Sequence, residues 1–206
     1  MNGRLKNVSS EVSKIKPTAI IDVDETLWNS SIVMYNTARA LGYEFPVPSD
    51  WTHWNIFWEY VPKEKMFPVF DAVHSAQNNH PPYLEAEDFL DFMRRNYHVI
   101  IASHRDPKYH DELEQWLREN NLQYDEVSTS FDKTELFRRP GVEVVVDDRD
   151  ETLEIAASNG LLALGLRKPW NRVVEDKIHL FWSLNDIVEY LMSQGVGKNP
   201  NRGRLT

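Results

Sequence analysis

The chain of 206 residues contains no cysteine. This absence excludes disulfide bonds, thiol nucleophiles and zinc sites built on cysteine. Long apolar runs are also missing, because no stretch approaches the roughly 18 apolar residues that a transmembrane helix needs. The first residues, MNGRLKNVSSEVSKIKP, lack the apolar segment of a signal peptide. We therefore expect a cytoplasmic protein with no membrane partner.

Basic residues are fewer than acidic ones. The sequence has 23 Lys and Arg against 32 Asp and Glu, which gives a formal net charge of −9 and a pI near 5.3. Affinity for nucleic acids comes mainly from basic groups that neutralise phosphates, so we expect no nucleic-acid partner. A content of 41% hydrophobic and 12% aromatic residues is typical of a folded globular protein. We expect this globule to be a monomer or a homodimer.

Four short apolar runs predict strands. Each is apolar on successive positions, as in a strand that is buried on both faces of a parallel sheet. Amphipathic segments at 84–97, 109–120, 151–159 and 184–194 predict helices around and between them. A repeated order of strand and helix predicts an α/β fold with right-handed crossovers. The four predicted strands are Thr18-Ala-Ile-Ile-Asp22, His98-Val-Ile-Ile-Ala-Ser103, Glu143-Val-Val-Val-Asp147 and Leu161-Leu-Ala-Leu-Gly-Leu166.

The connection after the first predicted strand is long. About 55 residues follow it without a convincing buried strand, whereas an ordinary βα connection has about 2–6 residues. Two segments in this stretch, 30–41 and 63–77, have helical character. We predict that residues 30–82 form a small helical cap over the strand ends, and that 17–29 and 83–195 form the core. The two ends, 1–16 and 196–206, are predicted to be flexible.

Polar side chains stand at the ends of three predicted strands. Ligands of open parallel sheets bind beyond the carboxyl ends of the strands, so these groups converge on one edge. Four carboxylates at close range would repel one another, and a hard divalent cation relieves that repulsion. An all-oxygen set of ligands favours Mg²⁺. The side chains are Asp22 and Asp24 after the first strand, Ser103 at the end of the second, Asp147 and Asp148 at the third, and Lys133 from the segment before the third.

The run Ile20-Ile-Asp-Val-Asp-Glu-Thr-Leu27 resembles the first motif of the haloacid dehalogenase (HAD) superfamily, DxDxT after apolar residues. Ser103 resembles the second motif, Lys133 the third, and Val144-Val-Val-Asp-Asp148 the acidic fourth. The four motifs occur in order and bracket residues 18–150. The resemblance implies a Rossmann-like three-layer α/β core with a parallel central sheet, and a mainly helical cap inserted after the first motif.

The same resemblance implies a role for each motif residue. Asp22 is the implied nucleophile, which forms an aspartyl-phosphate, and Asp24 is the implied general acid and base. A dehalogenase lacks the second aspartate, so the presence of Asp24 favours phosphoryl transfer. Ser103 and Lys133 are the implied ligands of the phosphoryl oxygens.

Mg²⁺ is the implied cofactor. Its ligands would be the Asp22 carboxylate, the backbone carbonyl of Asp24 and a carboxylate of the fourth motif. Asp148 aligns with the usual direct ligand. Asp147 would lie next to the ligands without binding the metal itself. The sequence alone leaves the order of these two aspartates open.

Within the superfamily the chain resembles the 5′(3′)-deoxyribonucleotidases through the cap length, Asp147-Asp-Arg149 and Lys168-Pro-Trp-Asn171. It departs from them at Glu25, where they have glycine, and after Ser103, where His-Arg replaces Pro. The implied partner is a small phosphate ester such as a nucleoside monophosphate, with His104, Arg105, Trp54 and Trp58 as candidate substrate contacts. The run Asp-x-Asp-x-Thr-Leu-Trp also resembles magnesium-dependent phosphatases of sugar or protein phosphates, which have almost no cap.

Two non-enzymatic interpretations compete with a phosphatase. Receiver domains also combine acidic residues, Mg²⁺, Ser or Thr and Lys, but their acceptor aspartate lies on a middle strand and their lysine comes last. An inactive HAD-like binding module is disfavoured by the intact set of motif residues. Taken singly, Ser103 is more often a helix N-cap, Lys133 a surface lysine, and the cap tryptophans core residues.

Overall fold

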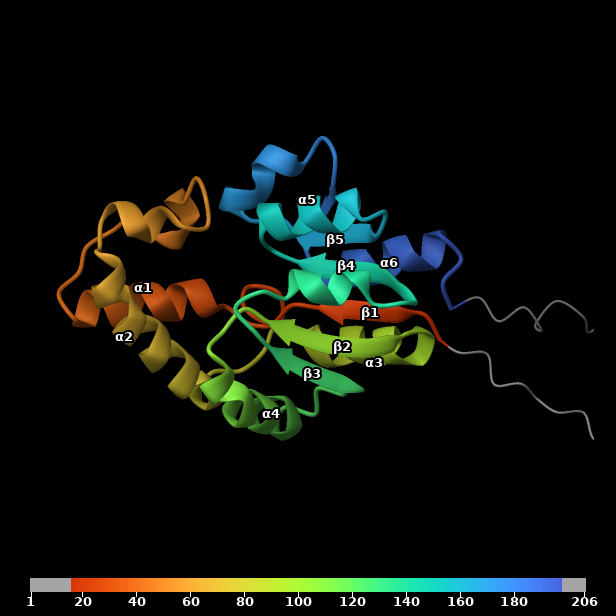
Figure 1. Ribbon diagram of the computed structural model, residues 1–206, viewed down its shortest axis with the longest axis horizontal. Helices are drawn as coiled ribbons and strands as arrows, with labels where there is room; N and C mark the ends of the chain where they lie inside the picture. The colour runs from red at the N-terminus through yellow and green to blue at the C-terminus, as the bar shows by residue number, and fades with distance from the viewer. Residues whose placement is uncertain (1–15, 198–206) are drawn as a thin grey trace, which may run out of the picture.

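The computed structural model describes residues 16–197 and contains one parallel sheet of six strands (Figure 1). Its strand order is β3-β2-β1-β4-β5-β6, with β1 in the interior between β2 and β4. The predicted parallel α/β fold is confirmed. The ends predicted to be flexible lie outside the described residues, apart from residues 16, 196 and 197. The strands are β1 Thr18–Ile21, β2 His98–Ser103, β3 Glu126–Thr129, β4 Val142–Asp147, β5 Leu162–Leu166 and β6 His179–Phe181.

Both faces of the central strands are buried. Ile21 of β1 contributes to a large apolar cluster on one face, and its neighbour Ile20 contributes to a second cluster on the other. Helices α3 (Ala86–Asn96), α4 (His110–Glu119) and α6 (Leu184–Ser193) supply the first cluster, and α5 (Asp150–Ser158) supplies the second. Side chains of a strand alternate between faces, so two covered faces require successive apolar residues. The result is three layers, helix, sheet and helix.

Two of the described helices, α6 and α1 (Ser30–Ala40), begin at side chains that cap their first turn. At the start of α6, Ser183 Oγ accepts a hydrogen bond from Asp186 N at 3.1 Å, and Asp186 Oδ2 accepts one from Ser183 N at 3.0 Å. This reciprocal pair satisfies backbone donors that a helix start leaves free. Helix α1 begins after Asn29, whose Oδ1 accepts from Ile32 N at 3.3 Å. None of the described helices has the length and hydropathy that a membrane span requires.

The segment between β1 and α3 is helical and aromatic. It holds α1, α2 (Lys63–Ser75) and the short 3₁₀ turns η1 (Pro48–Asp50), η2 (Ile56–Glu59) and η3 (Gln77–Asn79). Helices α1 and α2 pack against each other. In Figure 1 the arrowheads of β2 and β3 point toward them, so the helical segment lies beyond the carboxyl ends of the strands. This is the position expected of a cap. The cap boundaries of 30–82 stay a prediction.

Two strands were not expected from the sequence. Strand β3 has one aliphatic residue, Val127, and its four residues are only half-buried. Strand β6 has three residues, of which His179 is exposed. Both strands lie at the edges of the sheet. An edge strand buries less surface than a central one, so its sequence lacks the continuous apolar run that identified the others.

Candidate active site

The sheet order brings the ends of β1, β2 and β4 side by side. Strand β1 pairs with both neighbours, with Ile21 opposite Ile101 of β2 and Val146 of β4. The backbone N–H of Asp22 continues the pairing by donating to the carbonyl oxygen of Val146 at 2.9 Å. Asp22 therefore leaves β1 directly beside Asp147, the last residue of β4.

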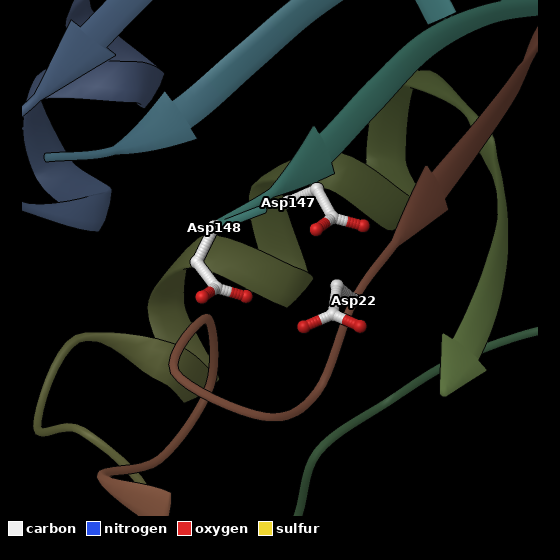
Figure 2. Close-up of side chains that lie close together, drawn as sticks. All are labelled: Asp22, Asp147 and Asp148. Carbon is white, nitrogen blue, oxygen red and sulfur yellow. The ribbon is translucent and has the colours of Figure 1, made fainter. Parts of the chain in front are cut away.

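Three carboxylates converge at this point. Oxygen atoms of Asp22, Asp147 and Asp148 lie within 4.8 Å of one another, and all three residues are buried. Figure 2 shows Asp147 at the end of β4 and Asp148 just beyond it, with their carboxylates beside that of Asp22. Burial raises the pKa of Asp22 to about 7, against the opposing effect of Lys133. Burial also raises the pKa of Asp148, and the Asp22 and Asp147 carboxylates raise it further.

Lys133 is the cation inside this group. It lies in the loop between β3 and η5 (Thr134–Arg138) and is 4% exposed. Its Nζ pairs with Asp22 Oδ1 and lies 2.6 Å from Asp147 Oδ2. Burial alone would lower the pKa of Lys133, but Asp147 and Asp22 hold it above the ordinary value of a lysine. The side chain is therefore charged at neutral pH.

Asp24 points to a different set of partners. Its Oδ2 lies 3.1 Å from the Arg105 guanidinium and accepts a hydrogen bond from Ser103 Oγ at 3.1 Å, and its Oδ1 accepts from Trp28 Nε1 at 3.0 Å. Burial raises the pKa of Asp24, but the charge of Arg105, together with His74 and the hydrogen bonds from Arg105 and Trp28, holds the pKa below its ordinary value. Asp24 is thus ionised and fixed by three donors.

Arg105 is a fully buried guanidinium that connects two parts of the fold. Its Nε donates to Ser103 Oγ at 2.6 Å, and its Nη1 donates to Gln77 Oε1 in η3 at 2.6 Å. With the ion pair to Asp24, it joins the ends of β1 and β2 to the helical segment. Arg105 was predicted as a substrate contact; it lines the cavity described below, and that role stays a prediction.

The two fourth-motif aspartates differ in their partners. Asp147 uses both oxygens within the protein, since Oδ2 faces Lys133 and Oδ1 accepts from Arg149 N at 2.9 Å. Asp148 has one oxygen in a hydrogen bond, Oδ2 with Trp170 Nε1 at 2.8 Å. This difference leaves one oxygen of Asp148 free for a metal ion and none of Asp147, as expected if Asp148 is the direct ligand.

A cavity of about 360 Å³ lies between the strand ends and the helical segment. Its polar wall includes Asp22, Asp24, Lys133 and Asp148. Ser103 and Asp147 do not line it, so of the predicted site residues these two reach it only through their hydrogen-bonded neighbours. The opposite wall is aromatic and comes from the helical segment, which supplies Trp54, Phe57, Trp58, Phe67 and Phe70; His104 and Phe131 lie on the core side.

Three residues near the site were not selected as site residues from the sequence. Trp170 and Asn171, in η6 (Pro169–Val174) after β5, bond to Asp148, and Lys168 pairs with Glu25 at 2.9 Å. The sequence contains a pattern that could have identified them, because Lys168-Pro-Trp-Asn171 directly follows the end of a predicted strand. The strand-end argument that selected Asp147 applies equally to this run.

No family model matches the chain, and no curated protein matches it. Among solved structures, a haloacid dehalogenase-like family hydrolase from Streptococcus pneumoniae aligns with a TM-score of 0.66 at 13% identity, over 85% of this chain and 98% of that one. The chain has the haloacid dehalogenase fold. The HAD core predicted from the motifs is therefore confirmed as a fold.

Other solved structures align with the chain at a similar level. A predicted phosphatase from Clostridium acetobutylicum gives a TM-score of 0.63 at 13% identity, over 87% of this chain and all of that one. YfnB from Bacillus subtilis is a candidate HAD hydrolase whose structure holds magnesium. It aligns with a TM-score of 0.57 at 12% identity, over 87% of this chain and 100% of that one. In the HAD fold of the present chain, the four motifs stand at adjacent strand ends and in the loop that reaches them.

The site residues fit a divalent cation. Asp22, Asp24, Asp147 and Asp148 bring four carboxylates, and only Lys133 and Arg105 are paired with them as buried cations among the described residues. The four carboxylates therefore carry two more negative charges than the two cations balance, and a divalent cation would neutralise this excess. All the donors are oxygens, which are the ligands that Mg²⁺ prefers.

Proposed function

We propose that this chain is a Mg²⁺-dependent phosphohydrolase that works through an aspartyl-phosphate on Asp22. The observation that carries the proposal is the buried Asp22 carboxylate, placed at the end of a central strand between Lys133 and two further carboxylates. Buried carboxylates at this density are costly unless they are compensated by cations. The HAD fold and its hydrolase and phosphatase neighbours support the proposal.

The metal ligands in this proposal are the carboxylates of Asp22 and Asp148 and the backbone carbonyl of Asp24. Bound Mg²⁺ supplies charge stabilisation at the phosphoryl oxygens. Lys133 adds a fixed positive charge at the same place and keeps the Asp22 carboxylate oriented. Asp147 orients Lys133 in turn, because its Oδ2 lies 2.6 Å from Nζ.

In the first chemical step, a carboxylate oxygen of Asp22 attacks phosphorus and the bond from phosphorus to the leaving oxygen breaks. Asp24 gives its proton to that oxygen, so the product leaves as a neutral alcohol. Asp24 must be protonated for this step, although Arg105 lowers its pKa in the free protein. The negative charge of a bound phosphate raises the pKa of a neighbouring carboxyl, which favours the protonated form.

In the second step, the ionised Asp24 takes a proton from water as that water attacks phosphorus. The bond between phosphorus and Asp22 breaks, and inorganic phosphate leaves with the carboxylate restored. Asp24 ends the cycle protonated, loses that proton to solvent in the free protein, and takes one up again when the next phosphate group binds and raises its pKa. Its two fixed oxygens, held by Arg105, Ser103 and Trp28, keep it in place for both transfers.

The proposed substrate is a small phosphomonoester such as a (deoxy)nucleoside monophosphate. Support comes from the cavity, which combines the acidic wall with Trp54, Trp58 and other aromatic side chains that offer flat faces to a base. His104 and Arg105 line the same space. A magnesium-dependent phosphatase of sugar or protein phosphates is the alternative. The helical segment over the strand ends limits access by a macromolecule, which disfavours the protein substrates.

Phosphate release from a panel of nucleoside 5′- and 3′-monophosphates and sugar phosphates, with Mg²⁺ or with EDTA, tests this proposal. Release should require the metal and disappear in Asp22→Asn, because an amide is not a nucleophile. Asp176→Asn, an exposed aspartate, is the matched control and should retain full activity. Activity in Asp22→Asn, or equal rates in EDTA, would contradict the mechanism.

A further inference from the structure

Trp170 contacts the acidic cluster from outside the four motifs. It lies in η6, just after β5, and is 1% exposed. Its Nε1 donates a hydrogen bond to Asp148 Oδ2 at 2.8 Å. An indole N–H is a donor only, so it fixes one carboxylate oxygen and with it the rotation of the whole carboxylate. The other oxygen, Oδ1, has no protein hydrogen-bond partner among the described residues.

The next residue fixes the main chain of the same aspartate. Asn171 is fully buried, and its Nδ2 donates to the carbonyl oxygens of Asp148, at 2.8 Å, and Leu166, at 2.7 Å. Its Oδ1 accepts from Lys168 N at 2.9 Å, which closes η6 on itself. Trp170 and Asn171 therefore hold Asp148 by side chain and by backbone together.

The indole ring is itself held from the helical segment. Its centroid lies 5.4 Å from that of Trp51 and 5.3 Å from that of Trp54. Trp51 is buried and anchored by a hydrogen bond from its Nε1 to the carbonyl oxygen of Pro46 at 2.8 Å. Trp54 belongs to the aromatic wall of the cavity. These contacts oppose rotation of the Trp170 ring away from Asp148.

We propose that Trp170 is a positioning residue that presents the free oxygen of Asp148 to the divalent cation. The inference rests on the proposed function, because it requires that the cation binds at Asp148. Partners that orient a metal ligand commonly change metal affinity about 10- to 100-fold when they are removed. Trp170→Phe removes the donor and keeps a ring in the aromatic packing, so we expect Mg²⁺ affinity to fall by about that factor.

Isothermal titration of the metal-free chain with MgCl₂ measures this affinity without any substrate. Trp116→Phe is the matched control, because Trp116 is also fully buried and its Nε1 also donates a 2.8 Å hydrogen bond, to the carbonyl oxygen of His80 in place of a carboxylate. The control should bind Mg²⁺ as the unmodified chain does. Benzothienylalanine at position 170 keeps the shape of tryptophan without the N–H, and it replaces Trp170→Phe if the latter does not fold.

Each outcome decides the inference. Weaker Mg²⁺ binding in the position-170 variant alone supports it. Binding within twofold of the unmodified chain, or equal losses in the Trp116 control, overturns it. If the unmodified chain does not bind Mg²⁺, the metal dependence of the proposed function fails and the role of Trp170 fails with it. If the unmodified chain binds Mg²⁺ and the position-170 variant binds equally well, only the role of Trp170 fails.

Discussion

Replacing Lys168 by methionine removes the cation that is paired with a buried carboxylate. Lys168 Nζ lies 2.9 Å from Glu25 Oε2 and 2.9 Å from the hydroxyl oxygen of Tyr83. The side chain of Glu25 is 3% exposed, and that of Lys168 is 15% exposed. Methionine retains most of the aliphatic stem, so the change removes the charge and its hydrogen bonds to Glu25 and Tyr83 while the packing of the stem is kept.

The expected loss of stability follows from this burial. Removing one partner of a buried pair leaves an uncompensated charge and costs about 3–5 kcal/mol. For a chain of this size each kcal/mol corresponds to about 2–4 °C, so Tm should fall by about 6–20 °C. Ser31 N still donates to Glu25 Oε1 at 2.6 Å in the variant, which favours the lower part of the range.

Urea unfolding followed by circular dichroism at pH 7 in EDTA measures the loss. Lys177→Met is the matched control, because Lys177 pairs with Glu154 at 3.2 Å while their side chains are 72% and 47% exposed. An exposed pair contributes about 0.2–1 kcal/mol. Equal losses in the two variants would refute the reasoning from burial. Adding Glu25→Gln to Lys168→Met should recover part of the stability, because the isolated charge is then absent.

Three further predictions concern catalysis, packing and pH. Asp24→Asn should reduce kcat about 10²–10⁴-fold with Mg²⁺ affinity retained in a calorimetric titration; a loss of metal binding would show that its side chain is a ligand. Gly165→Ala should cost about 1–3 kcal/mol in urea unfolding, since its Cβ would lie 2.8 Å from Leu180 Cδ2, and an unchanged midpoint would contradict that close contact. Burial raises the pKa of Asp125, but a β2 backbone N–H and Arg94 outweigh it and hold the pKa below its ordinary value. Asp125→Asn should therefore be less stable than the unmodified chain at pH 7, and the difference should narrow as the pH falls through about 4; a constant difference from pH 7 to 3 would refute this.

The central strands could be predicted because burial on both faces requires a continuous apolar sequence. Val144, Val145 and Val146 of β4 show this, since alternate residues enter different clusters on the two faces. Strands β3 and β6 could not be found in this way, because each has a neighbour on one side only. Their pairing depends on the sheet that is already present and not on a pattern of their own.

The candidate site was predictable to the extent that strand ends determine it. Asp22 and Asp147 meet because consecutive residues of paired parallel strands stay in register. The contact of Arg105 with Gln77 had no such basis, since it joins a strand end to a turn of the helical segment. Neither residue type indicates the contact, because arginine and glutamine are mostly exposed in proteins. The left-handed backbone of Glu25, with φ of 61°, was also beyond prediction in a non-glycine residue.

The interior position of β1 has a consequence for synthesis on the ribosome. Thr18 of β1 pairs with His98 and with Val142, so the earliest strand waits for partners made about 80 and 124 residues later. At about 5–20 residues per second, these delays are roughly 4–16 s and 6–25 s. Both edges of this apolar strand are open until β2 is made, and the edge that faces β4 stays open until β4 is made. Open strand edges are sites of intermolecular pairing. Nascent chains that stall before residue 142 should therefore depend on chaperones more than the finished protein does.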